Sequence, residues 1–190
     1  MMQAANPKVE ASIAAQPAAS PPSSRQPSAR ARPEIVCKWE KFSLIVREIG
    51  ALVQRQFAEV GVEREAIPLD PDWSRYFEYE RAGILHIWGA RANGVLVGYV
   101  VCLICPGLHH MSTLHAYADL FWLAPEWRDG STGWRFLKSV EKPLKELGVK
   151  VLRFNTNDTH RPDAQGRSMV SSLLVRNGFS RVETVHQKVL

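Results

Sequence analysis

A short stretch, WRDGSTGW (127–134), gathers a basic residue, two glycines and two hydroxyl residues just ahead of a run that reads as a helix. The glycines leave the backbone open to close approach. A helix that begins after such a loop exposes unpaired N–H groups at the positive end of its dipole, where phosphate binds. The pattern therefore predicts a phosphate or pyrophosphate site. Gly130, Ser131 and Gly133 let an anion approach the backbone, Ser131 and Thr132 add hydroxyls, and Arg128 adds a fixed positive charge.

Neither common nucleotide-binding motif fits this stretch. The ATP/GTP phosphate loop requires Gly, four residues and then Gly-Lys-Ser/Thr, and the dinucleotide fingerprint requires Gly-x-Gly-x-x-Gly. Neither run occurs in the chain. The alternative without a ligand is that the glycines only end a loop and cap the following helix.

The elements ahead of the loop follow from the spacing of apolar residues. Residues 40–60 carry apolar side chains at helical spacing and stop at Gly61, and a short second helix is expected between Trp73 and Gly83. Two strands then meet at the hairpin pair Asn93-Gly94. A further strand, LHAYADLFWL (114–123), leads into the loop.

The elements behind the loop alternate between helix and strand. A helix is expected over about 132–147, then a strand over 149–156, a helix over about 167–177, and a last strand from about Arg181. Helices, a hairpin and then alternating strands and helices indicate a mixed α/β fold with one central sheet.

Composition limits the number of domains. The chain has 190 residues, of which 45% are hydrophobic, enough for one sizeable core. Residues 1–33 are rich in Ala, Pro and Ser and are expected to be a disordered tail, which leaves 34–190 as the domain. A net charge of +5 admits acidic small molecules and nucleic acid. Because the domain lacks a helix-turn-helix or aromatic RNA-binding signature, nucleic acid is not the expected partner.

The three cysteines indicate reduced thiols. Cys37, Cys102 and Cys105 are an odd set, and no secretion signal or membrane span is apparent, so we expect a soluble cytoplasmic protein, either a monomer or a homodimer. The CLIC spacing places two thiols on opposite faces of a strand. Buried thiols are therefore favoured over a metal site, and no metal is predicted.

The loop and its surroundings resemble the Gcn5-related N-acetyltransferase (GNAT) superfamily. The hallmark Arg/Gln-x-x-Gly-x-Gly/Ala corresponds to 128–133, although Ser131 stands where the motif has its first glycine and Gly130 sits one place earlier. The segments RANGVLVGYVV (91–101), LAPEW (123–127) and LLVRNGF (173–179) also match the family, in the right order. The resemblance extends from about Cys37 to Leu190.

The resemblance implies a sheet of about six to seven strands, splayed between strands four and five and flanked by about four helices. The pantetheine arm of acetyl-coenzyme A, a co-substrate, would lie in the opening against the backbone around Trp122 and Leu123. The N–H groups of 129–134 would bind its diphosphate. The reaction implied is acetyl transfer to an amine, whose identity the sequence does not give.

That reaction needs a base to take the amine proton and benefits from an acid at the leaving thiolate. Strict alternation along the strand puts His115, Tyr117 and Asp119 on one face, with Phe121 and Leu123, and Ala116, Ala118, Leu120 and Trp122 on the other. Asp119 lies where many family members carry the base, and His115 and Tyr117 are further candidates. The alternatives are a structural carboxylate, a packed histidine and a core tyrosine.

Leu174 and Ser131 are departures from the family that leave the activity open. The usual acid tyrosine of the family corresponds to Leu174, so Ser171, Tyr117 or water would have to supply the proton. A catalytically inactive module that binds acyl-coenzyme A or regulates is therefore the alternative function. Residues 157–167 form either an acceptor-binding loop or a solvated loop. The aromatic residues of 73–79 either line the acceptor site or belong to the core.

Overall fold

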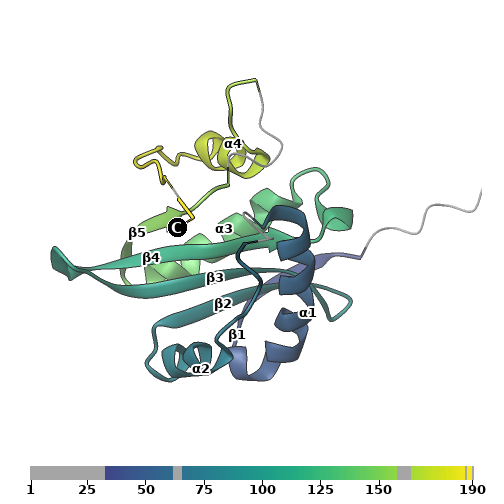
Figure 1. Ribbon diagram of the computed structural model, residues 1–190, viewed down its shortest axis with the longest axis horizontal. Helices are drawn as coiled ribbons and strands as arrows, with labels where there is room; N and C mark the ends of the chain where they lie inside the picture. The colour runs from purple at the N-terminus through teal and green to yellow at the C-terminus, as the bar shows by residue number, and fades with distance from the viewer. Residues whose placement is uncertain (1–32, 62–65, 158–163, 187, 190) are drawn as a thin grey trace, which may run out of the picture. The chain divides into compact units, whose positions relative to one another are not determined.

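The computed structural model describes residues 33–61, 66–157, 164–186 and 188–189, which belong to one compact unit (Figure 1). The predicted tail, apart from its last residue, lies outside the described residues. The elements are β1 (Ile35–Glu40), α1 (Phe42–Val60), α2 (Trp73–Arg81), β2 (Leu85–Ala92), β3 (Val95–Gly107), β4 (His110–Leu123), a 3-10 turn (Pro125–Trp127), α3 (Thr132–Glu146), β5 (Val149–Phe154) and α4 (Met169–Arg176).

The sheet has the order β1-β2-β3-β4-β5, antiparallel except for the parallel pair β4 and β5. The mixed fold with four helices is confirmed. The hairpin between β2 and β3 is confirmed as well, because Asn93 and Gly94 both have positive φ, 49° and 82°. The first strand, β1, was not recognised from the sequence.

The predicted number of strands was too high. The described residues form five strands, and no strand begins at Arg181. Val182 and Val185 are 73% and 81% exposed, so the β-branched residues of this segment pack against no neighbouring strand. β-Propensity largely reflects such packing, and without a partner it does not produce a strand.

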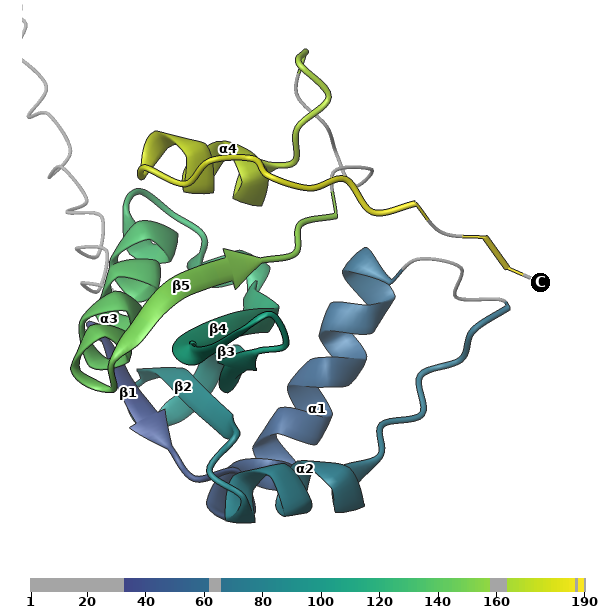
Figure 2. The same ribbon diagram turned by 90° about the vertical axis from the view of Figure 1, so that its left-hand side faces the viewer.

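Helices cover both faces of the sheet (Figure 2). On one face, α3 packs Phe136, Val140 and Leu144 against a core that includes Trp88 and Val100. The opposite face packs against the apolar side of α1 and the aromatic residues of α2. The apolar spacing that predicted α1 therefore marks its buried stripe.

Strands β4 and β5 part before β4 ends. Their register runs from Leu114 opposite Val149 to Ala118 opposite Phe154. Beyond Ala118, β4 continues to Leu123 paired only with β3, while β5 has ended. The sheet thus opens at the end of β4 that leads into the 127–134 loop.

Candidate functional site

A β-bulge in β4 sets the position of Asp119. Val101 on β3 is opposite Leu120, but its neighbour Cys102 is opposite Ala118, so Asp119 is an extra residue without a partner. A bulge of this kind shifts the alternation of side chains by one residue.

The strict alternation expected along β4 is therefore wrong beyond Ala118. Phe121 and Leu123 join the core on the α3 side, and Leu120 and Trp122 join the core on the α1 and α2 side. Before the bulge the sides are reversed, because Ala118 packs on the α3 side. His115 and Tyr117 thus share the α1 and α2 face, without Phe121 and Leu123.

The Asp119 carboxyl stands on this same face and remains exposed. No described residue forms an ion pair with it. Partial desolvation by its surroundings raises the pKa of Asp119 above the ordinary aspartate value. Burial, followed by the Asp119 charge, raises the pKa of Tyr76 on α2, which places α2 across from the carboxyl.

His115 and Tyr117 form a contiguous polar group ahead of Asp119. His115 is only 4% exposed, and its Nδ1 atom lies 3.5 Å from the Tyr117 hydroxyl. The His115 ring also stacks on His110, with ring centroids 6.1 Å apart. The guanidinium of Arg153 on β5 lies 5.6 Å from the Tyr117 ring centroid. A packed histidine with one tyrosine neighbour is what the structure shows for His115.

The backbone of β4 offers polar groups to the opening beside β5. The Ala124 N–H donates to the Val97 carbonyl at 2.8 Å, and groups along an antiparallel strand alternate in direction. Phe121 and Leu123 therefore direct their N–H and C=O groups away from β3, toward the side where β5 has ended. A ligand with its own amides can pair with such groups.

The loop ahead of α3 has the form expected of an anion site. Among the described residues, the N–H groups of Gly130, Ser131, Gly133 and Trp134 find no acceptor. Gly130 has a φ of 50°, which favours glycine at the turn. α3 has no acidic residue in its first turn and no side-chain cap. Four unpaired donors therefore gather at the positive end of a 15-residue helix.

Thr132 and Asp129 are arranged differently from their neighbours. The Thr132 N–H donates to the Asp129 carbonyl and its hydroxyl donates to the Asp129 carboxylate, both at 3.1 Å. These bonds close the turn internally. Thr132 therefore shapes the loop, and the neighbouring N–H groups are the open ones.

Arg128 is held by α1. Its guanidinium donates to both carboxylate oxygens of Glu59, at 2.5 and 2.6 Å, and its Nε donates to the Leu123 carbonyl at 2.6 Å. The Trp122 indole N–H donates to the same Glu59 at 2.9 Å. The structure thus places Arg128 between the end of β4 and α1, where it fixes the start of the loop. The Leu123 carbonyl is taken by Arg128, and its N–H faces the opening.

Leu174 and Ser171, the two positions of α4 considered for the acid, are both buried. Leu174 is 5% exposed and packed, and its carbonyl accepts from the Phe179 N–H. Ser171 is 8% exposed, and its N–H donates to Ser168. Of the 157–167 segment, residues 158–163 lie outside the described residues. Asn157 donates from its side chain to the Val60 carbonyl at 3.1 Å.

The aromatic residues of α2 pack rather than line an opening. Trp73, Tyr76 and Phe77 contact the Phe42 ring at centroid distances of 5.8, 5.1 and 5.0 Å. They are partly buried members of the core on the α1 and α2 side.

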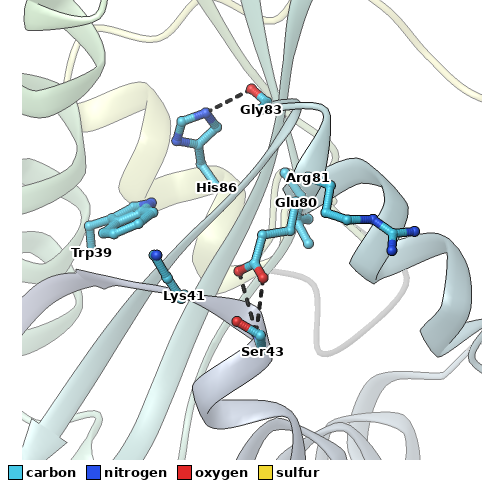
Figure 3. Close-up of a pocket in the computed structure, with 8 residues that line it drawn as sticks. Trp39, Lys41, Ser43, Glu80, Arg81, Gly83 and His86 are labelled. Atoms are coloured by element: carbon cyan, nitrogen blue, oxygen red, sulfur yellow. Dashed lines mark hydrogen bonds between the residues drawn. The ribbon is translucent and has the colours of Figure 1, made fainter.

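A separate hollow of about 280 Å³ lies beside the start of β2 (Figure 3). Trp39, Lys41, Glu80 and His86 line it, and the Glu80 carboxylate accepts from the Ser43 N–H. β2 runs parallel to β4, so a hollow at the start of β2 lies far from the loop that follows β4. It takes no part in the candidate site.

The thiols do not gather into a site. Cys37 and Cys105 are partly buried and Cys102 is fully buried, and burial raises the pKa of Cys102 to about 12. Within the described ranges, no three His, Cys, Asp or Glu side chains come together as a metal ion would require. None of the helices there combines the length and hydropathy needed to cross a membrane.

The candidate site thus combines a split between β4 and β5, a β-bulge next to the split, and a glycine loop ahead of α3. The model of the acetyltransferase (GNAT) family matches residues 48–166. The chain belongs to the GNAT acetyltransferase family. The match includes the bulge, the loop and α3. A search of curated protein sequences finds no match.

Solved structures share the GNAT fold at low identity. An acetyltransferase from Clostridium acetobutylicum, described as predicted and crystallised with acetyl-CoA, is 15% identical, with a TM-score of 0.61 over 82% of this chain and 96% of its own. An aminoglycoside acetyltransferase from an uncultured soil sample, in complex with sisomicin, is 10% identical, with a TM-score of 0.61 over 82% and 95%. A ribosomal-protein-alanine N-acetyltransferase from Brucella melitensis biovar Abortus 2308 is 14% identical, with a TM-score of 0.57 over 83% and 99%.

Two site residues of this GNAT protein were missed in the sequence. Glu59 lies on a helix predicted only for its apolar stripe, and Arg153 lies on a strand that showed no motif. No local pattern marks either residue, because each acts through a partner distant in the chain, Arg128 and Tyr117.

Proposed function

We propose that the protein is an acetyl-CoA-dependent N-acetyltransferase that transfers an acetyl group directly to an amine in a ternary complex. The observation that carries the proposal is the set of four unpaired N–H groups at the start of α3, placed at the end of the opening between β4 and β5. A long ligand with a diphosphate at one end and amides along its arm matches both parts. The acetyl-CoA present in the Clostridium structure supports the same choice.

The residues of the loop and of the opening have different parts in this proposal. The N–H groups of Gly130, Ser131, Gly133 and Trp134 bind the diphosphate, and Gly133 also allows it to approach. Phe121 and the Leu123 N–H pair with the pantetheine amides. Arg128 holds the loop to Glu59, and its charge acts on the diphosphate from behind the loop. This is a positioning role.

The transfer itself requires a neutral amine beside the thioester. Asp119, directly or through a water molecule, accepts the proton as the amine nitrogen attacks the carbonyl carbon. The C–N bond forms, the C–S bond breaks, and the electron pair leaves on the sulfur of coenzyme A. Holding the two reactants side by side supplies a large part of the rate. Because the pKa of Asp119 is raised, it lies closer to the pKa of the amine, which makes Asp119 a better proton acceptor.

The departing thiolate takes its proton from solvent or from Tyr117. Leu174 cannot donate a proton, and the Tyr117 phenol lies on the Asp119 face. His115, which touches that hydroxyl, can return the proton to it. A thiolate is already a good leaving group, so this step needs little assistance.

The competing function is a module that binds acyl-coenzyme A without turnover. Leu174 and Ser131 are the departures that favour it. It retains the loop and the opening and therefore predicts the same coenzyme binding. Turnover is what separates the two.

The test is thiol release from acetyl-CoA with a panel of amines. The proposal predicts release above the hydrolysis rate with at least one amine, and a loss of that release in Asp119→Asn while acetyl-CoA still binds. Tight binding with no release on a broad panel would support the module instead.

A further inference from the structure

Arg153 is a cation on the Asp119 face. It lies on β5 opposite Tyr117, is partly buried, and lies over the face of the Tyr117 ring at 5.6 Å. Its guanidinium forms no hydrogen bond or ion pair with any described residue. Two other partly buried arginines are held by carboxylates: Arg91 by Glu40 and Glu48, and Arg128 by Glu59.

An unpaired, partly buried guanidinium is available to bind an anion. Removing a charged group from water without a hydrogen-bond acceptor costs free energy. The flat fork of arginine matches a carboxylate with two parallel hydrogen bonds. Tyr117 holds one face of the fork by a cation–π contact and leaves its N–H edge open. The edge is therefore preorganised for an anion.

Asp119 is an anion on the same face, but it does not fill this role. Asp119 lies two residues beyond Tyr117 along β4, about 7 Å, and Arg153 lies one strand across, about 5 Å. Their α-carbons are thus roughly 8 Å apart. No ion pair joins their side chains. The two opposite charges lie on the same face, near the point where the pairing of β4 with β5 ends.

We infer that the acceptor is a small amine that carries a carboxylate, of the amino-acid class. Its ammonium nitrogen lies toward Asp119, which takes its proton, and its carboxylate binds Arg153. The inference rests on the proposed function. It differs from the neighbouring aminoglycoside acetyltransferases, because a polycation would gain nothing from Arg153.

The experiment compares free L-amino acids with their carboxamides, as acceptors for the wild-type protein, Arg153→Gln and Arg153→Lys. The carboxamide has the same side chain and a less basic amine, which favours its reaction, so a preference for the acid reports the carboxylate. The wild type should prefer at least one acid by on the order of 10- to 100-fold in kcat/KM. Arg153→Gln should abolish that preference by raising KM, with KM for acetyl-CoA unchanged. Arg153→Lys should restore part of it.

Arg47→Gln, a change at an exposed arginine of α1, is the matched control and should leave the preference intact. Acceptor binding is also measured without turnover, by saturation-transfer NMR of the same amino acids with the coenzyme A complex. Amino-acid signals that are present with the wild type and lost with Arg153→Gln support the inference.

Failure of the inference is distinguishable from failure of the function. If acetyl-CoA is bound and amines are acetylated, but acids and carboxamides react equally or Arg153→Gln affects both alike, the inference is overturned and the function stands. If acetyl-CoA is not bound at all, the function fails. In that case, the NMR measurement is made on the protein without coenzyme A. Amino-acid signals that are the same for the wild type and Arg153→Gln then overturn the inference independently.

Discussion

Glu59 on α1 accepts hydrogen bonds from the Arg128 guanidinium with both of its carboxylate oxygens, at 2.5 and 2.6 Å. This ion pair connects α1 to the loop that precedes α3. The side chains are only 18% and 23% exposed. Breaking such a pair leaves a charge without its partner in a poorly hydrated place.

Glu59→Gln should therefore cost about 1–3 kcal/mol of unfolding free energy and weaken acetyl-CoA binding. The loss of affinity follows because Arg128 no longer fixes the first residues of the loop. Urea unfolding and titration calorimetry measure the two effects.

Glu126→Gln is the matched control. Glu126 pairs with Arg55 at 2.9 Å, but these side chains are 54% and 49% exposed. Loss of that pair should cost about 0–1 kcal/mol. Equal destabilisation by the two substitutions would refute a special role for the Glu59 pair.

Asp119→Asn should lower kcat/KM for acetyl transfer on the order of 100-fold or more, because the base is lost. In the wild type, the rate should fall as the pH is lowered, first as the amine becomes protonated and again as Asp119 becomes protonated through its raised pKa. The variant should retain only the first fall. A second fall that persists in the variant would assign the base to another group.

The same substitution should not reduce stability at neutral pH. The pKa of Asp119 is higher in the folded chain than in the unfolded one. Its contribution to stability is thus fully present below the unfolded pKa and is lost as pH rises through the folded pKa. The neutral asparagine avoids this loss. Thermal unfolding should show Asp119→Asn equal to or slightly above wild type near pH 7, and a lower melting temperature would show that the carboxylate is structural.

Sequence and structure agree most closely where local chemistry decides. The apolar stripe predicted α1, and Asn93-Gly94 predicted a turn that needs two positive φ angles. The anion-binding loop was predicted in the same way, from glycines and hydroxyl residues ahead of a helix, and its binding role stays a prediction.

The bulge at Asp119 shows where the sequence does not suffice. One inserted residue reverses which side chains of β4 face α3, and no residue type marks the insertion. The extra residue appears only when β3 and β4 are paired. The expected strand after Arg181 fails for a related reason, since pairing partners decide whether β-branched residues form a strand.

Gly133→Ala separates phosphate binding from folding. A Cβ at this position would meet only the Leu173 side chain, at an ordinary contact distance of 3.7 Å. Alanine also suits a helix better than glycine, so stability should be unchanged or slightly higher. The added methyl group stands where the diphosphate would approach, and acetyl-CoA affinity should fall about tenfold or more. Unchanged affinity by calorimetry would place the diphosphate elsewhere.

Gly98→Ala and Gly50→Ala should have opposite effects on stability. A Cβ at Gly98 would lie 2.8 Å from the Trp122 carbonyl oxygen, so β3 and β4 would have to move apart at a cost of about 1–3 kcal/mol. At Gly50, inside α1, the nearest atom is in Trp73 at 3.9 Å. Alanine there should add about 0.5–1 kcal/mol. Chemical unfolding of both variants checks the pair, and a stable Gly98→Ala would contradict the close strand contact.

The most direct test of the diphosphate site is calorimetric titration with acetyl-CoA and with S-acetylpantetheine, which has the same thioester and no diphosphate. The unpaired N–H groups at the start of α3 predict that acetyl-CoA binds at least on the order of 100-fold more tightly. Equal affinities, or no heat from acetyl-CoA, would contradict the account.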